Sequence, residues 1–154
     1  MNKEIIKQKV NSAINKLYQN DKFLFDNDLC ERCIVHRLAV CLEREGFEGY
    51  YVDCEYNKSH LNKKTGPKVV SNLNGNYIDI VITKRNENGN DDLVCFEIKK
   101  YNNYSNRDKD RENLCILTNN SNFYYNIGYY IILGKTEEKT KIELYENGRK
   151  IISQ

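Results

Sequence analysis

The feature that most constrains the fold of this chain is a pair of segments, residues 77–83 and 93–100, on either side of a turn-rich stretch centred on Asn88-Gly89. Both segments are rich in β-branched and aromatic residues, and an Asn-Gly pair between two such segments is typical of a β-hairpin. Successive side chains of a strand point to opposite faces, so one face of this hairpin is entirely apolar. That face comprises Ile78, Ile80, Ile82, Val94, Phe96 and Ile98, and we expect it to lie in the hydrophobic core.

The opposite face of the hairpin carries Asp79, Glu97 and Lys99. If the strands pair symmetrically about Asn88, Asp79 and Glu97 are cross-strand neighbours with Cβ atoms about 5 Å apart. Two carboxylates at that distance repel each other unless a proton or a cation lies between them, and a hard divalent cation is the natural occupant of a cluster of oxygen ligands. The alternative is a surface ion-pair cluster in which Lys99 pairs with Asp79 or Glu97.

A glutamate in the middle of an apolar helix face points to the same site. A helix is predicted over residues 29–45, because the acidic and amide side chains of residues 26–28 can cap its start and Gly46 can end it. Its apolar arc comprises Ile34, Val35, Leu38, Ala39, Cys41 and Leu42, and Glu31 falls in the middle of that arc. A carboxylate on an apolar face is costly unless it is paired, so we expect Glu31 to reach the same cation.

The remaining segments predict an α/β, or α+β, fold. Helices are expected over residues 3–18 and 106–117, a loop over 58–75, and strands over 50–57, 128–133, 141–145 and 150–152. We expect a central mixed sheet of four or five strands flanked by helices. The length of 154 residues is that of one domain, and no flexible linker interrupts it, so residues 1–154 are interpreted as a single domain.

The charge balance limits how the chain could bind nucleic acid. Its 24 Lys and Arg against 22 Asp and Glu give a net charge of +2, so no strong field of the whole molecule attracts a polyanion. Any affinity for nucleic acid must therefore come from local basic patches. The loop over 58–75 holds Lys58, His60, Lys63, Lys64 and Lys68, which could grip phosphates or simply be solvated. Glu55, on the preceding strand, could reach the site or face solvent; Glu55 and Lys58 are accessory candidates.

Two further readings of the chain concern its compartment and its cysteines. No segment approaches the roughly 18 apolar residues of a membrane span, and the polar start has no signal-peptide core, so we expect a cytoplasmic protein with no membrane partner.

Most of the six cysteines are then expected to be reduced and buried. Cys30-x-x-Cys33 is half of a zinc motif, but a zinc site usually takes two such pairs. A zinc-dependent interaction module stays a third hypothesis.

Asp79, the Glu97-Ile98-Lys99 segment, the helical Glu31 and the order helix–strand–strand–strand–helix–strand together resemble the PD-(D/E)xK restriction-endonuclease-like nuclease superfamily. More narrowly, Glu31-Arg32, the segment 35–38 and the segment 55–57 resemble small bacterial and phage members of it. The resemblance covers roughly residues 28 to 134, and Ile78 stands where the motif name has proline.

This resemblance implies a restriction-endonuclease-like core and a divalent-metal-dependent endonuclease acting on DNA. It implies that Asp79, Glu97 and the backbone carbonyl of Ile98 bind Mg²⁺ or Mn²⁺ and that Glu31 holds a metal-bound water or a second ion. Lys99 would position or deprotonate the attacking water and stabilise charge on the phosphate. The alternative is a non-catalytic module of the same fold that binds nucleic acid or a protein. A nuclease of this size has little surface for sequence recognition. We therefore expect it to act as a homodimer, on a branched substrate, or with a partner that supplies targeting.

Overall fold

A computed structural model describes residues 1–56, 77–85, 93–119 and 125–151. These residues form an α+β fold, a mixed open sheet of six strands with four α-helices packed on it. Along the chain the elements are α1 (Lys3–Asn20), α2 (Lys22–Asp26), α3 (Glu31–Glu45), β1 (Tyr51–Tyr56), β2 (Ile78–Thr83), β3 (Val94–Lys100), α4 (Arg107–Leu117), β4 (Ile127–Leu133), the 3₁₀ helix η1 (Glu137–Lys139), β5 (Lys141–Glu146) and β6 (Arg149–Ile151).

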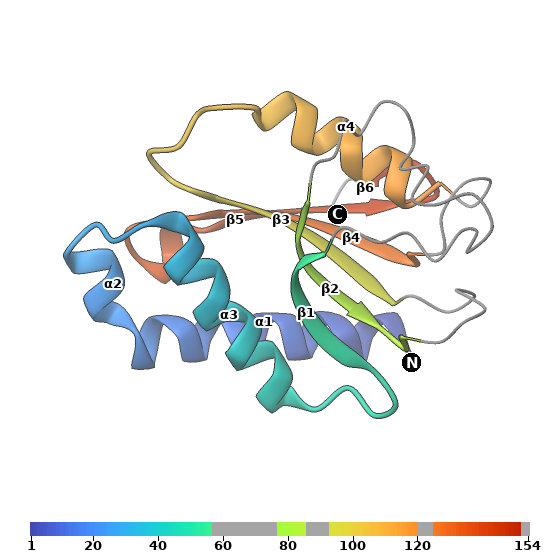
Figure 1. Cartoon of the computed structure of the whole chain (residues 1–154), viewed down its shortest axis with the longest axis horizontal. Coiled ribbons are helices and arrows are strands. Elements are labelled where there is room, and N and C mark those ends of the chain that lie inside the picture. Colours follow the sequence, from blue (N-terminus) through green and yellow to red (C-terminus); the bar gives the residue numbers. More distant parts are fainter. Residues whose placement is uncertain (57–76, 86–92, 120–124, 152–154) are drawn as a thin grey trace.

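The strands lie in the sheet in the order in which they occur in the chain, from β1 to β6 (Figure 1). All neighbours are antiparallel except β3 and β4, which are parallel. A parallel pair needs a crossover connection, and α4 provides it. The expectation of four or five strands was low, because the Asn147-Gly148 turn, with both residues at positive φ, lets the short β6 pair with β5.

The register of the central hairpin agrees with the symmetric pairing expected about Asn88, although the turn itself lies outside the described residues. Val81 pairs with Cys95, and the flanking pairs continue the same register. One more step along it places Asp79 opposite Glu97. The two carboxylates therefore come from neighbouring strands at the same level of the sheet.

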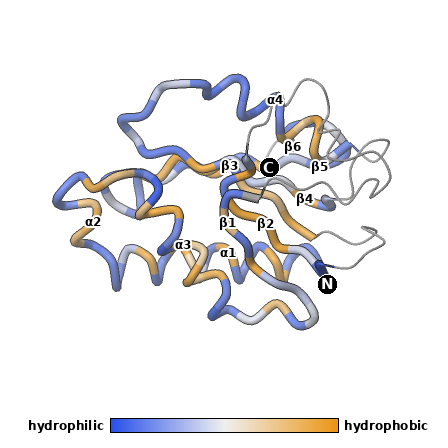
Figure 2. Tube along the Cα trace, in the orientation of Figure 1, coloured by the Kyte–Doolittle hydropathy of each residue, from blue (hydrophilic) through white to orange (hydrophobic). Residues whose placement is uncertain are grey.

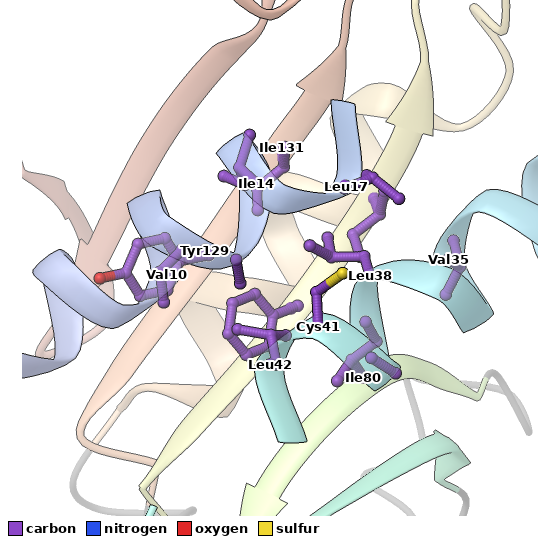
Figure 3. Close-up of a cluster of buried hydrophobic side chains, with 14 of the residues drawn as sticks. Val10, Ile14, Leu17, Val35, Leu38, Cys41, Leu42, Ile80, Tyr129 and Ile131 are labelled. Atoms are coloured by element: carbon purple, nitrogen blue, oxygen red, sulfur yellow. The ribbon is translucent and has the colours of Figure 1, made fainter. Parts of the chain in front are cut away.

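Helices cover both faces of the sheet: α1 and α3 lie on one side and α4 on the other (Figure 1). The larger core lies under α1 and α3, and the close-up shows side chains of both helices packed with Ile80, Tyr129 and Ile131 of the sheet (Figure 3). A smaller core under α4 includes Val81 and Leu114. The segment from β3 into α4 is mostly hydrophilic (Figure 2), so the chain is polar where it leaves the sheet to cross over.

The observed helix ends differ from the predicted ones in one place that matters for the site. The N-cap of α3 is Cys30, not a residue of the 26–28 segment. Asp28 instead accepts a hydrogen bond from Lys100 Nζ at 2.7 Å, which ties the approach to α3 to the end of β3. Among the described helices, none combines the length and apolarity needed to cross a membrane.

Candidate active site

A cavity of about 680 Å³ opens beside β2 and β3, between the first turns of α3 and the first half of α4. Each element contributes polar side chains to its wall. The lining residues are Glu31, Arg32, Val35 and His36 of α3, Cys54 and Glu55 of β1, Tyr77 and Asp79 at the start of β2, Glu97 and Lys99 of β3, and Asn106, Lys109, Asp110 and Asn113 at α4. All four residues predicted to form the core of the site therefore line one cavity.

Asp79 and Glu97 form an acidic pair in this cavity, with Glu97 buried and Asp79 half-buried. One carboxylate oxygen of Asp79 accepts the backbone N–H of Ile98 at 2.7 Å, and Glu97 is only 5% exposed. Burial raises the pKa of Asp79 to about 6, although the Ile98 N–H and Lys99 oppose the rise. Burial, followed by the charges of Asp79 and Asp110, raises the pKa of Glu97 well above its usual value. The pair thus holds negative charge poorly by itself, as two adjacent buried carboxylates must.

Lys99 is paired with a residue that the sequence analysis did not single out. Its Nζ lies 3.2 Å from Oδ2 of Asp110 on α4 and 3.9 Å from Oε1 of Glu31 on α3. Burial alone would lower the pKa of Lys99, but the carboxylates of Asp110 and Glu31 outweigh it and raise the pKa. Lys99 is therefore an ammonium group whose position and charge are maintained by two carboxylates. The expected alternative, a surface pairing of Lys99 with Asp79 or Glu97, differs from this arrangement, because Lys99 is half-buried and pairs with Asp110 instead.

Asp110 was missed because its helix has a mixed charge pattern, with Asp108, Asp110 and Glu112 between basic residues. The position of Asp110 in its helix could have identified it as a site residue. Asp110 shares a helix face with the buried residues Asn113, Leu114 and Leu117, so it faces the sheet whereas Asp108 does not. A carboxylate placed on an apolar helix face was the argument that singled out Glu31, and it applies equally to Asp110.

Glu31 reaches the site from the opposite helical layer. Its carboxylate accepts the backbone N–H of Lys100 at 2.7 Å and the side-chain amide of Asn103 at 3.0 and 3.1 Å. The expected partner was a cation; the structure also supplies these protein donors at the end of β3. Glu31 is thus fixed in place next to Lys99, with its side chain 27% exposed to the cavity side.

The accessory candidates lie at the rim or beyond the described residues. Glu55 is exposed and ion-paired with Arg32, whose Nε lies 3.3 Å from Oε1. It has a positive φ of 48°, although it stands in a strand between residues that pair regularly with β2; such backbone strain in a non-glycine residue clusters at functional sites. Lys58 and the other basic residues of the 58–75 loop lie outside the described residues.

The carboxylate oxygens of this cavity suit a hard cation that takes only one or two of its ligands from the protein. Within the described ranges, no three His, Cys, Asp or Glu side chains are grouped as a ready-made metal cage. Mg²⁺ does not need one, because it usually keeps several waters and is held by one or two carboxylates together with substrate phosphates. Asp79 and Glu97 offer two such carboxylates. Burial is the main cause of their raised pKa values, and a cation between them would favour the charged form of both.

No protein-family model, no curated protein and no solved structure matches this chain significantly. What the cavity does is therefore inferred from its own residues and their geometry.

Proposed function

We propose that this protein is a divalent-metal-dependent nuclease that hydrolyses phosphodiester bonds, with DNA as its substrate. The observation that carries the proposal is that the buried Glu97 and the half-buried Asp79 and Lys99 line one open cavity. Buried charges at this density are costly to a fold, and strongly perturbed titrating groups in a cleft are typical of active sites. The order of helices and strands and the mixed sheet also support the resemblance to the PD-(D/E)xK superfamily.

In this proposal Asp79 and Glu97 would hold a Mg²⁺ or Mn²⁺ ion, with the Ile98 backbone carbonyl as a further ligand. Such an ion, when bound, polarises a phosphoryl oxygen and lowers the pKa of a bound water. Lys99 stabilises the negative charge that develops on the phosphate. Because Asp110 and Glu31 keep the pKa of Lys99 raised, its role is to hold a positive charge at a fixed position rather than to remove a proton.

Glu31 and Asp110 act on either side of that lysine. Asp110 orients the ammonium group from α4, since their ion pair is 3.2 Å long. Glu31 presents a carboxylate oxygen 3.9 Å from the same Nζ, where it can accept a hydrogen bond from an attacking water. The lysine is thus positioned from both helical layers, and small errors in such positions cost large factors in rate.

Two basic side chains at the cavity, besides Lys99, could contact substrate phosphates. Arg32 and Lys109 lie at the edge of the cavity on opposite helices, and the side chain of Arg32 is 88% exposed. Contacts of this kind fix the position of a nucleic acid without reading its sequence. This favours a substrate chosen by structure, a homodimer or a targeting partner over sequence recognition by the chain alone.

The test is cleavage of a panel of nucleic acids in Mg²⁺ and in Mn²⁺. The panel holds plasmid, linear duplex, single-stranded DNA, a four-way junction and RNA. Wild type is compared with Lys99→Ala and with Asp108→Asn, a matched control whose side chain is 97% exposed on α4. We expect metal-dependent cleavage by wild type and the control, and none by Lys99→Ala.

Two other results would count against the proposal. Cleavage that survives in Lys99→Ala would place the reaction elsewhere or in a contaminant. A gel shift on the same panel without any cleavage would favour a module of this fold that binds nucleic acid without cutting it.

A further inference from the structure

The Cys30-x-x-Cys33 pair is a feature that the proposed nuclease does not use. The expectation that most cysteines are buried was wrong: Cys41 and Cys95 are buried and Cys115 is half-buried, whereas Cys30, Cys33 and Cys54 are exposed. An exposed thiol gains nothing from hydrophobic burial, so the ordinary reason for a structural cysteine does not apply at residues 30 and 33.

The local backbone brings the two thiols together. Cys30 is the N-cap of α3 and Cys33 lies in its first turn, where the Cys33 N–H donates to the Cys30 carbonyl at 3.1 Å. The two Sγ atoms are 2.7 Å apart. A covalent S–S bond is about 2.0 Å long, so the sulfur atoms need to move only by a fraction of an ångström each, with α3 left intact.

The two thiols also differ in reactivity. Cys30 is at the positive end of α3, which stabilises a thiolate, whereas Cys33 lies three residues further along the helix. An attacking thiolate next to a thiol that can resolve a mixed disulfide is the arrangement needed for thiol–disulfide exchange.

We infer that Cys30 and Cys33 form a redox-active dithiol, which a small-molecule disulfide such as oxidised glutathione converts into an intrachain disulfide. In the first step the Cys30 thiolate attacks one sulfur of the small disulfide, whose S–S bond breaks and releases one thiolate. In the second step Cys33 loses its proton and attacks Cys30 Sγ, which forms the Cys30–Cys33 bond and releases the second thiolate. The protein gives up two electrons and two protons, and the small disulfide becomes two thiols.

A metal does not explain the pair as well as this exchange does. Zinc requires four ligands in a structural site, and in the part of the chain that the structure describes no group of three or more His, Cys, Asp or Glu side chains is placed to hold a metal ion. His36 lies on the same helix but outside the first turn. Two sulfur atoms in contact with each other, at the surface, are arranged for a bond between them.

The proposed bridge would close the turn that carries Glu31. Glu31 lies between the two cysteines in the chain, and its carboxylate holds the N–H of Lys100. The inference itself does not depend on nuclease activity, because it rests on the thiol geometry alone.

The test is incubation of the folded, reduced full-length protein with mixtures of reduced and oxidised glutathione, read by intact-mass spectrometry and by counting free thiols. We expect wild type to lose two hydrogens and two free thiols while staying monomeric on a non-reducing gel. Cys33→Ser should instead hold one glutathione at residue 30, and Cys30→Ser should react more slowly. Cys54→Ser, which removes an exposed thiol outside the pair, should behave like wild type.

Several results would overturn the inference. One is a wild type that carries glutathione adducts but never loses two hydrogens. Another is a Cys30→Ser variant that still loses two hydrogens, because the bridge would then lie elsewhere. A third is a disulfide-linked dimer in place of the intrachain bridge. Circular dichroism of each serine variant establishes that it is folded, which is expected because both side chains are exposed.

Discussion

Replacing Asp79 by asparagine should make the protein more stable at neutral pH. Burial raises the pKa of Asp79 from its usual 3.8 to about 6, and each pKa unit corresponds to about 1.4 kcal/mol. The folded state therefore bears a cost of up to about 3 kcal/mol when this carboxylate is ionised. Asparagine is close in shape, and its carbonyl oxygen can still accept the Ile98 N–H that Asp79 accepts at 2.7 Å. The substitution removes the cost and keeps the hydrogen bond.

The gain should depend on pH in a defined direction. Below about pH 4 Asp79 is protonated in both the folded and the unfolded chain, so wild type and Asp79→Asn should be about equally stable. Between about pH 4 and pH 6 the unfolded chain releases the proton while the folded chain keeps it, so the stability of wild type falls as pH rises. Above about pH 6 the full difference of up to about 3 kcal/mol remains.

Urea unfolding at pH 4.0 and pH 7.5 measures this difference, and Asp108→Asn serves as the control. Its side chain is 97% exposed, so its free energy of unfolding should stay within about 0.5 kcal/mol of wild type. Mg²⁺ at about 100 times its dissociation constant should stabilise wild type by about 2.7 kcal/mol, and should leave Asp79→Asn unchanged. If Asp79→Asn is less stable than wild type at pH 7.5, or loses stability with pH as steeply, the buried-carboxylate reasoning is wrong.

Three further substitutions test other parts of the structure. Lys99→Met should lower the free energy of unfolding at pH 7 by about 3 kcal/mol, because it leaves Asp110 buried without its cation. Burial raises the pKa of Asp110, and loss of the Lys99 charge raises it further, so urea unfolding should show a smaller loss at pH 5 than at pH 7; equal losses would contradict the ion pair. Glu143→Gln should cost up to about 3 kcal/mol at neutral pH by removing the carboxylate that accepts from Arg111 Nε at 3.0 Å. The pKa of Glu143 is lowered to about 2, so this stabilisation is lost as pH falls from about 4.5 to about 2, and melting curves over that range should converge with those of wild type. Gly128→Ala should cost about 1–3 kcal/mol, since its Cβ would lie 3.0 Å from a methyl group of Thr118; an unchanged melting temperature would mean that α4 packs less closely on β4.

The central hairpin was predictable because two independent patterns agree on it. The alternation of apolar residues sets which face is buried, and the Asn-Gly turn sets the register, so the pairing of Val81 with Cys95 follows from local sequence. A slip of one residue would have turned the whole apolar face away from the larger core under α1 and α3. The juxtaposition of Asp79 and Glu97 could be anticipated for the same reason.

The partners of the site residues were less predictable, because they come from distant parts of the chain. The acidic segment before α3 has the composition of a cap, yet Asp28 pairs with Lys100 and leaves Cys30 as the N-cap. Likewise Asp110 meets Lys99 only because α4 folds back over β3. Local composition can offer a hydrogen-bonding group, but tertiary packing decides which partner it takes. The five residues of α2 are too few to show any helical periodicity.

The position of β4 has a consequence for when the cavity can form during synthesis. The acidic and basic side chains that line it come from residues between 31 and 113, whereas β4 follows at Ile127–Leu133 and is buried throughout its length. Glu97 and Lys99 are paired, through the backbone of β3, with Tyr130 and Ile132 of β4. During synthesis all the cavity residues are therefore made before the strand that fixes two of them. The proposed activity would be absent from a nascent chain that lacks β4 and would arise only after β4 has paired with β3.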